Sequence, residues 1–244
     1  MKFLVCISKT PDTTTKIAFT DNDTQFNSAG VQYILNPYDE WYALVRACEL
    51  KEKVGGTVTV INVGEADNEQ IIRKALAIGA DDAIRVDAPA ANAYFVAKQI
   101  AAHAAGYDMI LLGKETIDYN GSEVASTLAE LLDLPFVSYG TSLELEGTTA
   151  TITREIEGGS ETVSVATPLV VSAAKGMAEQ RIPNMQGIMK ARSKPLIVAP
   201  AVAVDNLVSI VNYTLPPAKT GVKMIDPDNV AELVRLLHEE AKVI

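Results

Sequence analysis

Hydrophobic and polar residues alternate along the first 133 residues in blocks that predict strands and helices in turn. Near-continuous apolar runs predict strands, at residues 2–8, 57–63, 82–86 and 108–113. Apolar residues at helical spacing predict intervening helices, at residues 37–53, 68–79, 92–105 and 121–133. Strands that are apolar throughout are typical of a parallel sheet covered on both faces. The pattern therefore predicts an α/β fold with a doubly wound, mostly parallel sheet.

The pattern changes after residue 135. Residues 141–147 and 149–159 alternate with period two around "EGTT", which predicts an added β-hairpin, and residues 160–173 continue as strand. Residues 176–195 carry two prolines, two glycines and three methionines without a sustained period, so we expect a long irregular excursion. The last predicted element is an amphipathic helix within 226–244, capped by Asp226 or Asp228.

Composition and charge exclude several classes of protein. The longest apolar runs are short and broken by proline, so we expect no membrane insertion. The start "MKFLVCIS" has no charged n-region or long apolar h-region, so we expect a cytoplasmic protein, or one of an organelle matrix if a targeting piece was removed. The formal net charge is −10, from 31 acidic and 21 basic residues, which argues against nucleic-acid binding.

The sequence offers little catalytic chemistry. Cys6 and Cys48 lie in apolar runs without CxxC spacing, and we interpret them as core residues. The two histidines, His103 and His238, have no cysteine or carboxylate pair at metal-ligand spacing, so we predict no metal site. No nucleophile–base–acid set is visible, which disfavours a hydrolase and leaves no predicted catalytic residue.

Ligands of parallel α/β sheets bind at the carboxyl ends of the strands. Here the loop "GKETIDYNGSEV" (113–124) follows a buried strand and leads into a helix. Asn120 and Glu123 have the spacing of a capping box, the ordinary structural interpretation. The same exposed N–H groups and the helix dipole can also hold a phosphate, with Gly113 and Gly121 allowing close approach of the backbone. Spacing alone leaves both interpretations open.

The segment "LNPYDE" (35–40) is ambiguous in the same way. Asn36 and Pro37 have the residue types of a helix cap and first helical position. Asp39 and Glu40 can favour the helix dipole or bind ribose hydroxyls.

Six segments of the chain, in order, resemble motifs of one family, the β subunit of electron transfer flavoproteins. They are "LVCISKTPDT", "LNPYDEWYALVRACELKEK", "IIRKALAIGADDAIRV", "LLGKETID", "TREIEGGSETV" and "GIMKARSKP", within residues 1 to about 195. The resemblance implies a Rossmann-like, adenine-nucleotide-binding fold and a heterodimer with an α subunit that carries the redox FAD. It also implies that this chain binds AMP, or a second FAD in electron-bifurcating members. Because a flavin performs the chemistry, the protein supplies binding and orientation.

Carried over by position, the resemblance implies a nucleotide site from three strand ends and one helix mouth. Its residues are Cys6, Asn36, Pro37, Tyr38, Asp39, Val63, Gly113, Asp118, Asn120, Gly121, Ser122, Glu123 and Val124. The chain departs from the family where Ser122, Glu123 and Val124 replace an Asn-Gln-Thr or Ala-Gln-Val run. Glu123 places a negative charge where a phosphate would bind, and Val124 offers no hydroxyl.

The resemblance also implies transient partners. A loop at about 174–190 would dock on acyl-CoA or other flavin dehydrogenases, with Met185 as its apolar anchor and Arg181 and Ile188 beside it. Electrons would pass on to a downstream quinone reductase. We expect residues 1–195 to form the nucleotide-binding domain and residues 196–244 a C-terminal extension that packs on the α subunit. The alternative is a stand-alone adenine-nucleotide-binding regulatory protein of the same fold.

Overall fold

The chain folds as two separate compact units. The computed structural model describes residues 1–219 and 221–244, and we describe each unit by itself. The first unit contains Met1–Ile17 and Asn27–Val211, and the second contains Ala18–Phe26 and Asn212–Ile244. The boundary that we expected at residue 195 therefore falls inside the first unit.

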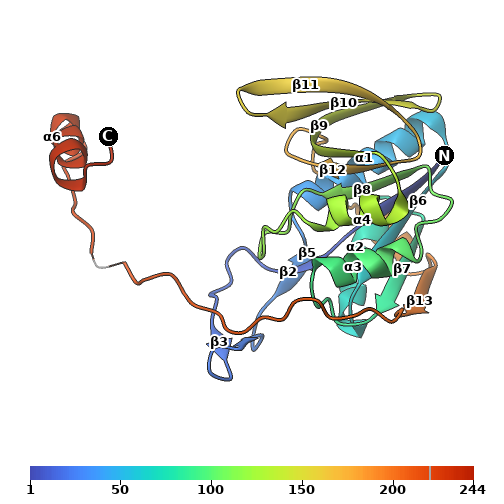
Figure 1. Ribbon diagram of the computed structural model, residues 1–244, viewed down its shortest axis with the longest axis horizontal. Helices are drawn as coiled ribbons and strands as arrows, with labels where there is room; N and C mark the ends of the chain where they lie inside the picture. Colours follow the sequence, from blue (N-terminus) through green and yellow to red (C-terminus); the bar gives the residue numbers. More distant parts are fainter. Residues whose placement is uncertain (220) are drawn as a thin grey trace. The chain divides into compact units, whose positions relative to one another are not determined.

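A nine-stranded sheet forms the centre of the first unit, in the order β11-β10-β9-β12-β8-β1-β6-β7-β13 (Figure 1). Neighbours from β9 to β13 in this order pair in parallel, whereas β10 is antiparallel to both β9 and β11. The strands are β1 (Lys2–Cys6), β6 (Thr57–Val63), β7 (Asp82–Asp87), β8 (Met109–Gly113), β9 (Phe136–Glu146), β10 (Thr149–Ile156), β11 (Gly159–Ala166), β12 (Leu169–Ala173) and β13 (Leu196–Pro200). A short pair of strands, β2 (Lys9–Pro11) and β5 (Tyr33–Leu35), follows β1.

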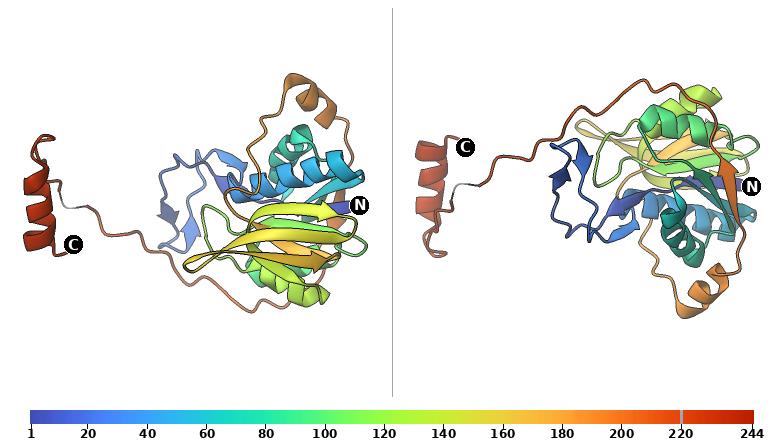
Figure 2. Two further views of the ribbon diagram at one scale, coloured as in Figure 1. Left: turned by 90° about the horizontal axis from the view of Figure 1, so that it is seen from above. Right: turned by 90° about the horizontal axis from the view of Figure 1, so that it is seen from below.

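Helices cover both faces of the parallel part of the sheet (Figure 2). One face carries α1 (Asp39–Val54) and α2 (Glu69–Ile78), the second preceded by the 3₁₀ turn η1 (Ala66–Asn68). The other face carries α3 (Ala93–Ala101) and α4 (Val124–Leu132). Successive side chains of β1 point to opposite cores, with Phe3 packed beneath α1 and Leu4 beneath α3 and α4. Both faces are buried, which explains why this strand is apolar throughout.

The structure confirms the predicted doubly wound fold and its added β-hairpin, which β9 and β10 form. It corrects the single strand that we expected over 160–173. The chain there divides into β11 and β12 around Thr167 and Pro168, and only β12 returns to the parallel sheet, between β8 and β9. Proline has no N–H for a ladder hydrogen bond, so a strand interior does not tolerate it.

The excursion that we expected to be irregular contains a short helix, α5 (Met185–Ala191). The side chain of Asn184 accepts a hydrogen bond from the N–H of Gly187 at 2.8 Å and caps the helix. The buried methyl group of Ala191 and a hydrogen bond from Arg73 to its carbonyl, at 2.9 Å, hold α5 against α2. Beyond α5, β13 pairs in parallel with β7 at the edge of the sheet.

The second unit consists of a short β-ribbon and the C-terminal residues. Its ribbon pairs β3 (Phe19–Thr20) with β4 (Gln25–Phe26), and the ring of Phe19 stacks on that of Tyr213 at 4.6 Å. The C-terminal helix α6 (Val230–Leu236) continues into the π-helical turn η2 (Leu237–Ala241). Its cap is neither Asp226 nor Asp228, because the side chain of Asn229 accepts from the N–H of Glu232 at 3.2 Å.

None of the helices in 1–219 and 221–244 is long and apolar enough to cross a membrane.

Candidate functional site

Three adjacent parallel strands end together at the site. β1 lies between β8 and β6 in the sheet, so their last residues Gly113, Cys6 and Val63 reach the same edge. Cys6 and Val63 are buried, each 6% exposed, whereas Gly113 is half-buried. The sheet thus brings together three of the predicted site residues that are far apart in the sequence.

Asn36 connects two segments of the predicted site. Its side-chain Nδ2 donates to the carbonyl of Glu115, and its Oδ1 accepts from the N–H of Ile117, both at 3.1 Å. The residue is fully buried. Asn36 therefore does not cap α1, as we considered from the sequence, because both ends of its amide are used to hold the loop after β8.

Helix α1 begins two residues later than its predicted start at Pro37. Tyr38 occupies the position before the helix with φ 63° and ψ −109°, makes no side-chain cap hydrogen bond, and is 53% exposed. Gly113 faces this helix start, since a Cβ on Gly113 would lie 2.7 Å from the backbone nitrogen of Glu40. The glycine is required here for the approach of α1 to β8, and no ligand is needed to explain it.

The predicted capping box at Asn120 and Glu123 does not form. Helix α4 begins at Val124, and Glu123 precedes it without a side-chain cap hydrogen bond. Asn120 and Ser122 both have φ 54°, which interrupts the helix before Val124. Within the described part of the chain, the N–H groups of Gly121, Ser122 and Glu123 have no hydrogen-bond acceptor. Consecutive N–H groups of such a turn form a concavity that suits an anion.

The other side chains of this loop differ in exposure. Asp118, Asn120 and Glu123 are exposed, whereas Ser122 and Val124 are half-buried. The hydroxyl of Ser122 contacts the carboxylate of Glu115, 3.4 Å away. The N–H of Asn120, which Glu123 was expected to cap, donates instead to the carbonyl of Thr116 at 3.0 Å, and the Glu123 side chain is exposed.

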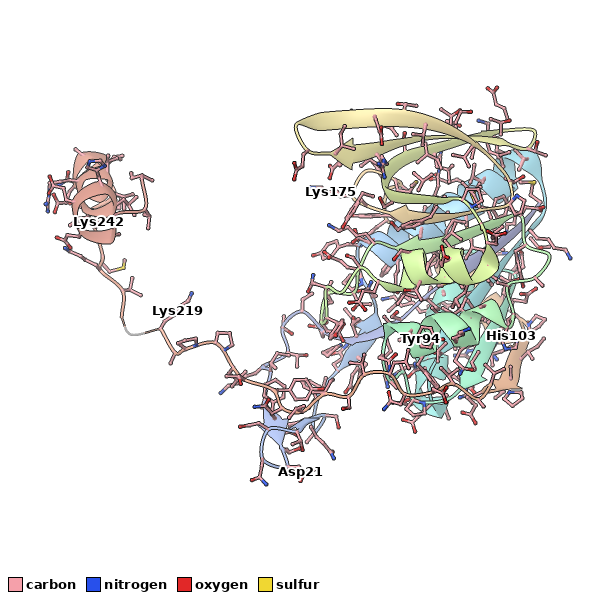
Figure 3. All side chains as sticks on the ribbon, in the orientation of Figure 1. Asp21, Tyr94, His103, Lys175, Lys219 and Lys242 are labelled. Atoms are coloured by element: carbon pink, nitrogen blue, oxygen red, sulfur yellow. The ribbon has the colours of Figure 1, made fainter. Side chains whose placement is uncertain are left out.

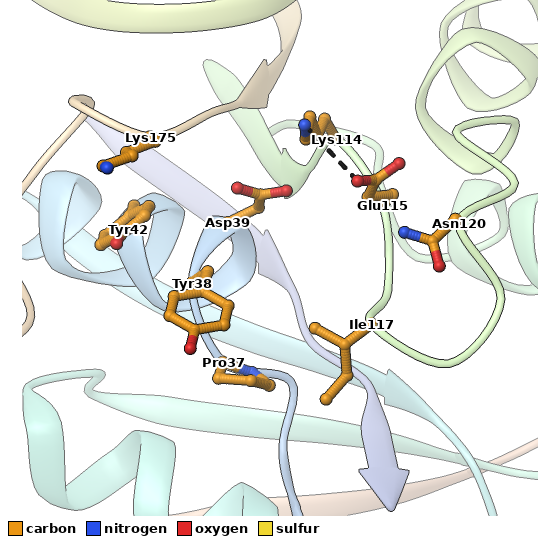
Figure 4. A pocket seen from close by; sticks show the side chains of 9 residues that line it. All are labelled: Pro37, Tyr38, Asp39, Tyr42, Lys114, Glu115, Ile117, Asn120 and Lys175. Carbon is orange, nitrogen blue, oxygen red and sulfur yellow. Dashed lines mark ion pairs between the residues drawn. The ribbon is translucent and has the colours of Figure 1, made fainter. Parts of the chain in front are cut away.

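A pocket of about 220 Å³ opens between α1 and the loops after β8 and β12 (Figure 4). Its lining contains the predicted site residues Pro37, Tyr38, Asp39 and Asn120. The volume is below the roughly 300–1,000 Å³ of pockets that enclose a whole drug-sized ligand. The pocket therefore suits part of a ligand.

Five residues of this pocket were not named individually from the sequence, namely Tyr42, Lys114, Glu115, Ile117 and Lys175. Three of these lie inside the predicted loop 113–124, and Tyr42 follows Tyr38 by about one helical turn. Lys175 had no such signal. It reaches the pocket because β12 pairs with β8, an arrangement that only the strand order reveals.

Burial controls the charge of the acids at the mouth of α1. It raises the pKa of Asp39 to about 6, against the opposing effect of the Lys114 ammonium, and the Glu115 carboxylate raises that pKa further. Lys114 and Glu115 form an ion pair of 3.4 Å at the pocket rim (Figure 4). Burial, and then the nearby Glu40 carboxylate, raise the pKa of the Cys6 thiol, which keeps it neutral.

The predicted docking segment presents apolar side chains to solvent. Met185 is 74% exposed and Ile188 42%, so neither side chain fills the core. Arg181, which we predicted beside the anchor, also makes contacts within the chain. Its Nη1 pairs with Oε1 of Glu52 at 2.7 Å, and its carbonyl accepts from the indole N–H of Trp41 at 3.3 Å.

The described residues contain no group of three or more His, Cys, Asp or Glu side chains arranged to hold a metal ion. His103 lies two residues beyond the end of α3 (Figure 3).

Comparisons with known proteins agree with this architecture. Residues 23–204 match the family model of the electron transfer flavoprotein domain. The chain is 36% identical to electron transfer flavoprotein subunit beta of Bacillus subtilis (strain 168), over 100% of both chains. It is 39% identical to electron transfer flavoprotein subunit beta of Syntrophomonas wolfei, over 94% of this chain and 92% of the relative. It is also 30% identical to acryloyl-CoA reductase electron transfer subunit gamma of Anaerotignum propionicum, over 98% and 99%.

Proposed function

The chain belongs to the electron transfer flavoprotein family, as a beta-type electron carrier subunit, and we propose that it pairs with an α subunit whose FAD carries the electrons. The heterodimer accepts electrons from acyl-CoA or other flavin dehydrogenases and delivers them to a downstream acceptor such as a quinone reductase. This chain binds AMP, or a second FAD if the complex bifurcates electrons, and supports the FAD of the α subunit. The flavin supplies the redox chemistry, and the residues of this chain bind and orient.

The observation that carries the nucleotide proposal is the turn before α4, whose N–H groups of Gly121, Ser122 and Glu123 have no acceptor in the described chain. A nucleotide phosphate supplies the acceptors that such groups require. At the neighbouring strand ends the apolar side chains of Cys6 and Val63 are buried, so they would support the site from beneath. Asn36 holds the loop against the mouth of α1, so the site is arranged before a ligand arrives.

The docking proposal rests on the combination of a firmly held helix and exposed apolar side chains. A Cβ on Gly187 would lie 2.6 Å from the carbonyl oxygen of Ala77, so α5 packs directly against the end of α2. On the same segment Ile182, Met185 and Met189 are 83%, 74% and 68% exposed. Flexible methionines adapt to a partner surface. We infer that this segment docks on the dehydrogenase, with Met185 as the anchor.

The pairing proposal rests on the C-terminal residues of the second unit. Leu215, Val222, Met224 and Val230 are each more than half exposed. Apolar side chains at this density on one segment are typical of a surface that a partner covers. We infer that the α subunit covers them.

The experiment that tests the function is purification of the chain co-expressed with the α subunit encoded in the same organism. We expect a yellow complex of two chains, and AMP or FAD in the nucleotide fraction released by denaturation and identified by mass. The α subunit purified alone shows how much flavin it holds by itself. A colourless single chain that binds adenine nucleotide would instead support a stand-alone regulatory protein. A yellow complex without any nucleotide beyond the single FAD would disprove the nucleotide proposal alone.

A further inference from the structure

Glu40 is a buried carboxyl group that forms no ion pair with any cation in residues 1–219 and 221–244. It lies in the first turn of α1 and is 6% exposed. Its Oε2 accepts a hydrogen bond from the backbone N–H of Ser8 at 2.6 Å, and its Oε1 lies 2.7 Å from the Ser8 hydroxyl oxygen. A buried ionised carboxylate is costly unless a cation or several donors compensate it. One serine supplies both of these contacts.

Glu40 occupies the junction of the elements that form the proposed nucleotide site. The last residue of β8 packs on it, because a Cβ on Gly113 would lie 2.8 Å from Cγ of Glu40. Ser8 lies half-buried just beyond β1, and its carbonyl accepts from the N–H of Asn36 at 3.0 Å. The titratable groups that face Glu40 are Asp118 from the loop after β8 and Cys6 at the end of β1. None of these groups is a cation.

These surroundings favour the neutral form of the carboxyl. Burial raises the pKa of Glu40 to about 8, the two hydrogen bonds from Ser8 oppose this, the Asp118 carboxylate raises the pKa further, and the Asn36 amide lowers it. The carboxyl therefore carries its proton at neutral pH. Since Oε2 already accepts from the Ser8 N–H, the proton resides on Oε1, facing the hydroxyl oxygen of Ser8.

The proton decides the direction of the hydroxyl bond. When Glu40 is protonated, it donates to the Ser8 oxygen, and the hydrogen of the Ser8 hydroxyl is free to donate to another acceptor. When Glu40 is ionised, the hydroxyl must donate to the carboxylate, and a negative charge lies beneath the strand ends. Ionisation of Glu40 thus removes the Ser8 hydroxyl as a donor and adds a negative charge. Both effects disfavour an anionic ligand at the carboxyl ends of the strands.

We propose that Glu40 is a positioning residue of the nucleotide site, which through its proton holds the Ser8 hydroxyl as a hydrogen-bond donor towards the bound nucleotide. The proposal rests on the proposed nucleotide function, and it predicts that AMP binding requires the neutral form of Glu40.

The test is AMP affinity of the heterodimer, stripped of nucleotide, measured by calorimetry from pH 7 to pH 9. The second ionisation of a phosphate monoester lies near pH 6, so the charge of AMP is constant over this range. With a pKa of about 8, binding restricted to the protonated form loses affinity about tenfold between pH 7 and pH 9. The wild-type complex must also take up a proton when AMP binds at pH 8.5. This uptake is measured from the binding enthalpies in buffers that differ in ionisation enthalpy.

Glu40→Gln is the decisive variant. The glutamine amide can donate to the Ser8 oxygen while its carbonyl accepts from the Ser8 N–H, so it imitates the protonated acid. We expect its affinity at pH 7 to stay within about twofold of wild type, with no fall up to pH 9 and no proton uptake. Ser8→Ala, which removes the hydroxyl, must weaken binding at pH 7. Glu130→Gln on the exposed side of α4 is the matched control and should keep the wild-type slope.

A wild-type affinity that does not change between pH 7 and pH 9, or a Glu40→Gln variant with the wild-type slope, overturns the proposal. If neither AMP nor FAD binds at any pH, the nucleotide function itself is wrong, and the protonation of Glu40 is tested without ligand. Because its folded pKa is raised, the stabilisation from the neutral carboxyl is present at low pH and is lost as the pH rises from about 4.5 through about 8. The wild-type melting temperature must then fall across this window relative to Glu40→Gln, and parallel melting profiles overturn the proposal.

Discussion

The proposed nucleotide site and the C-terminal segment 212–244 differ in where their side chains find partners. At the site, the fully buried amide of Asn36 has a partner at each end within the chain. In the C-terminal segment, Val222 is 80% exposed and Met224 85%. A region that satisfies its own polar groups can form a binding site alone, whereas a region that exposes apolar groups requires a second surface. This contrast supports the two proposals that this chain forms the nucleotide site and that the C-terminal segment packs on a partner.

The largest expected effect is that of removing residues 212–244. The cut follows Val211, where the first unit ends, and so leaves the edge strand β13 in place. We expect the shortened chain to keep its fold but to lose heterodimer formation completely, because it lacks the exposed apolar side chains that we propose the α subunit covers. Size-exclusion chromatography of the co-expressed chains measures the pairing, and circular dichroism checks the fold. Continued co-elution with the α subunit would show that the segment is not the main contact.

The second prediction concerns the anchor of the docking segment. We expect Met185→Ala to slow electron transfer from the partner dehydrogenase about tenfold or more, as for loss of a central apolar residue in an interface. Flavin content and melting temperature should not change, because Met185 is 74% exposed. Stopped-flow reduction of the complex by the dehydrogenase measures the rate.

Gln186→Ala is the matched control, since Gln186 is an exposed neighbour on the same helix. Arg181 is unsuitable, because its ion pair with Glu52 joins the segment to α1. Equal rates for Met185→Ala and Gln186→Ala would refute docking through Met185.

Asn36→Ala tests whether the buried amide of Asn36 stabilises the loop after β8. The substitution leaves the N–H of Ile117 and the carbonyl of Glu115 without their partner, which we expect to cost about 1–3 kcal/mol of unfolding free energy. The loop should then lose hydrogen-exchange protection at the Ile117 amide, and AMP binding should weaken with it. Denaturant unfolding measures the stability. Asp118→Ala, at an exposed position of the same loop without a left-handed backbone conformation, should have little effect on stability.

The smallest expected effect is that of Glu123→Gln. Because the Glu123 side chain makes no cap hydrogen bond, its removal should leave the melting temperature unchanged. If the turn holds a phosphate, loss of the neighbouring negative charge should tighten AMP binding about two- to fivefold, the range of a surface charge near a helix end. Calorimetry with AMP decides this, and unchanged or weaker binding would count against the phosphate position.

Local patterns determined much of the fold. The apolar strand runs and helical spacings predicted each strand and helix of the first 133 residues that form the parallel sheet and its cover, to within a few residues. The prediction was less accurate at the starts of helices, where contacts with residues far away in the sequence decide which side chain caps the helix. Asn36 has the residue type of a helix cap, but the loop after β8 uses both ends of its amide. Asn120 and Glu123 have capping-box spacing, yet the turn at Ser122 prevents the box.

The sequence by itself determined the alternation of strands and helices and the set of loops in which the site lies, since these follow from spacing over a few residues. Only the tertiary structure decided which strands are neighbours, and so brought Lys175 beside the loop after β8. It also decided that Glu40 is buried against Ser8, with no cation beside it in the described part of the chain, although acids in the first turn of a helix are usually exposed. Burial and charge environment depend on residues far away in the sequence, and no local pattern contains them.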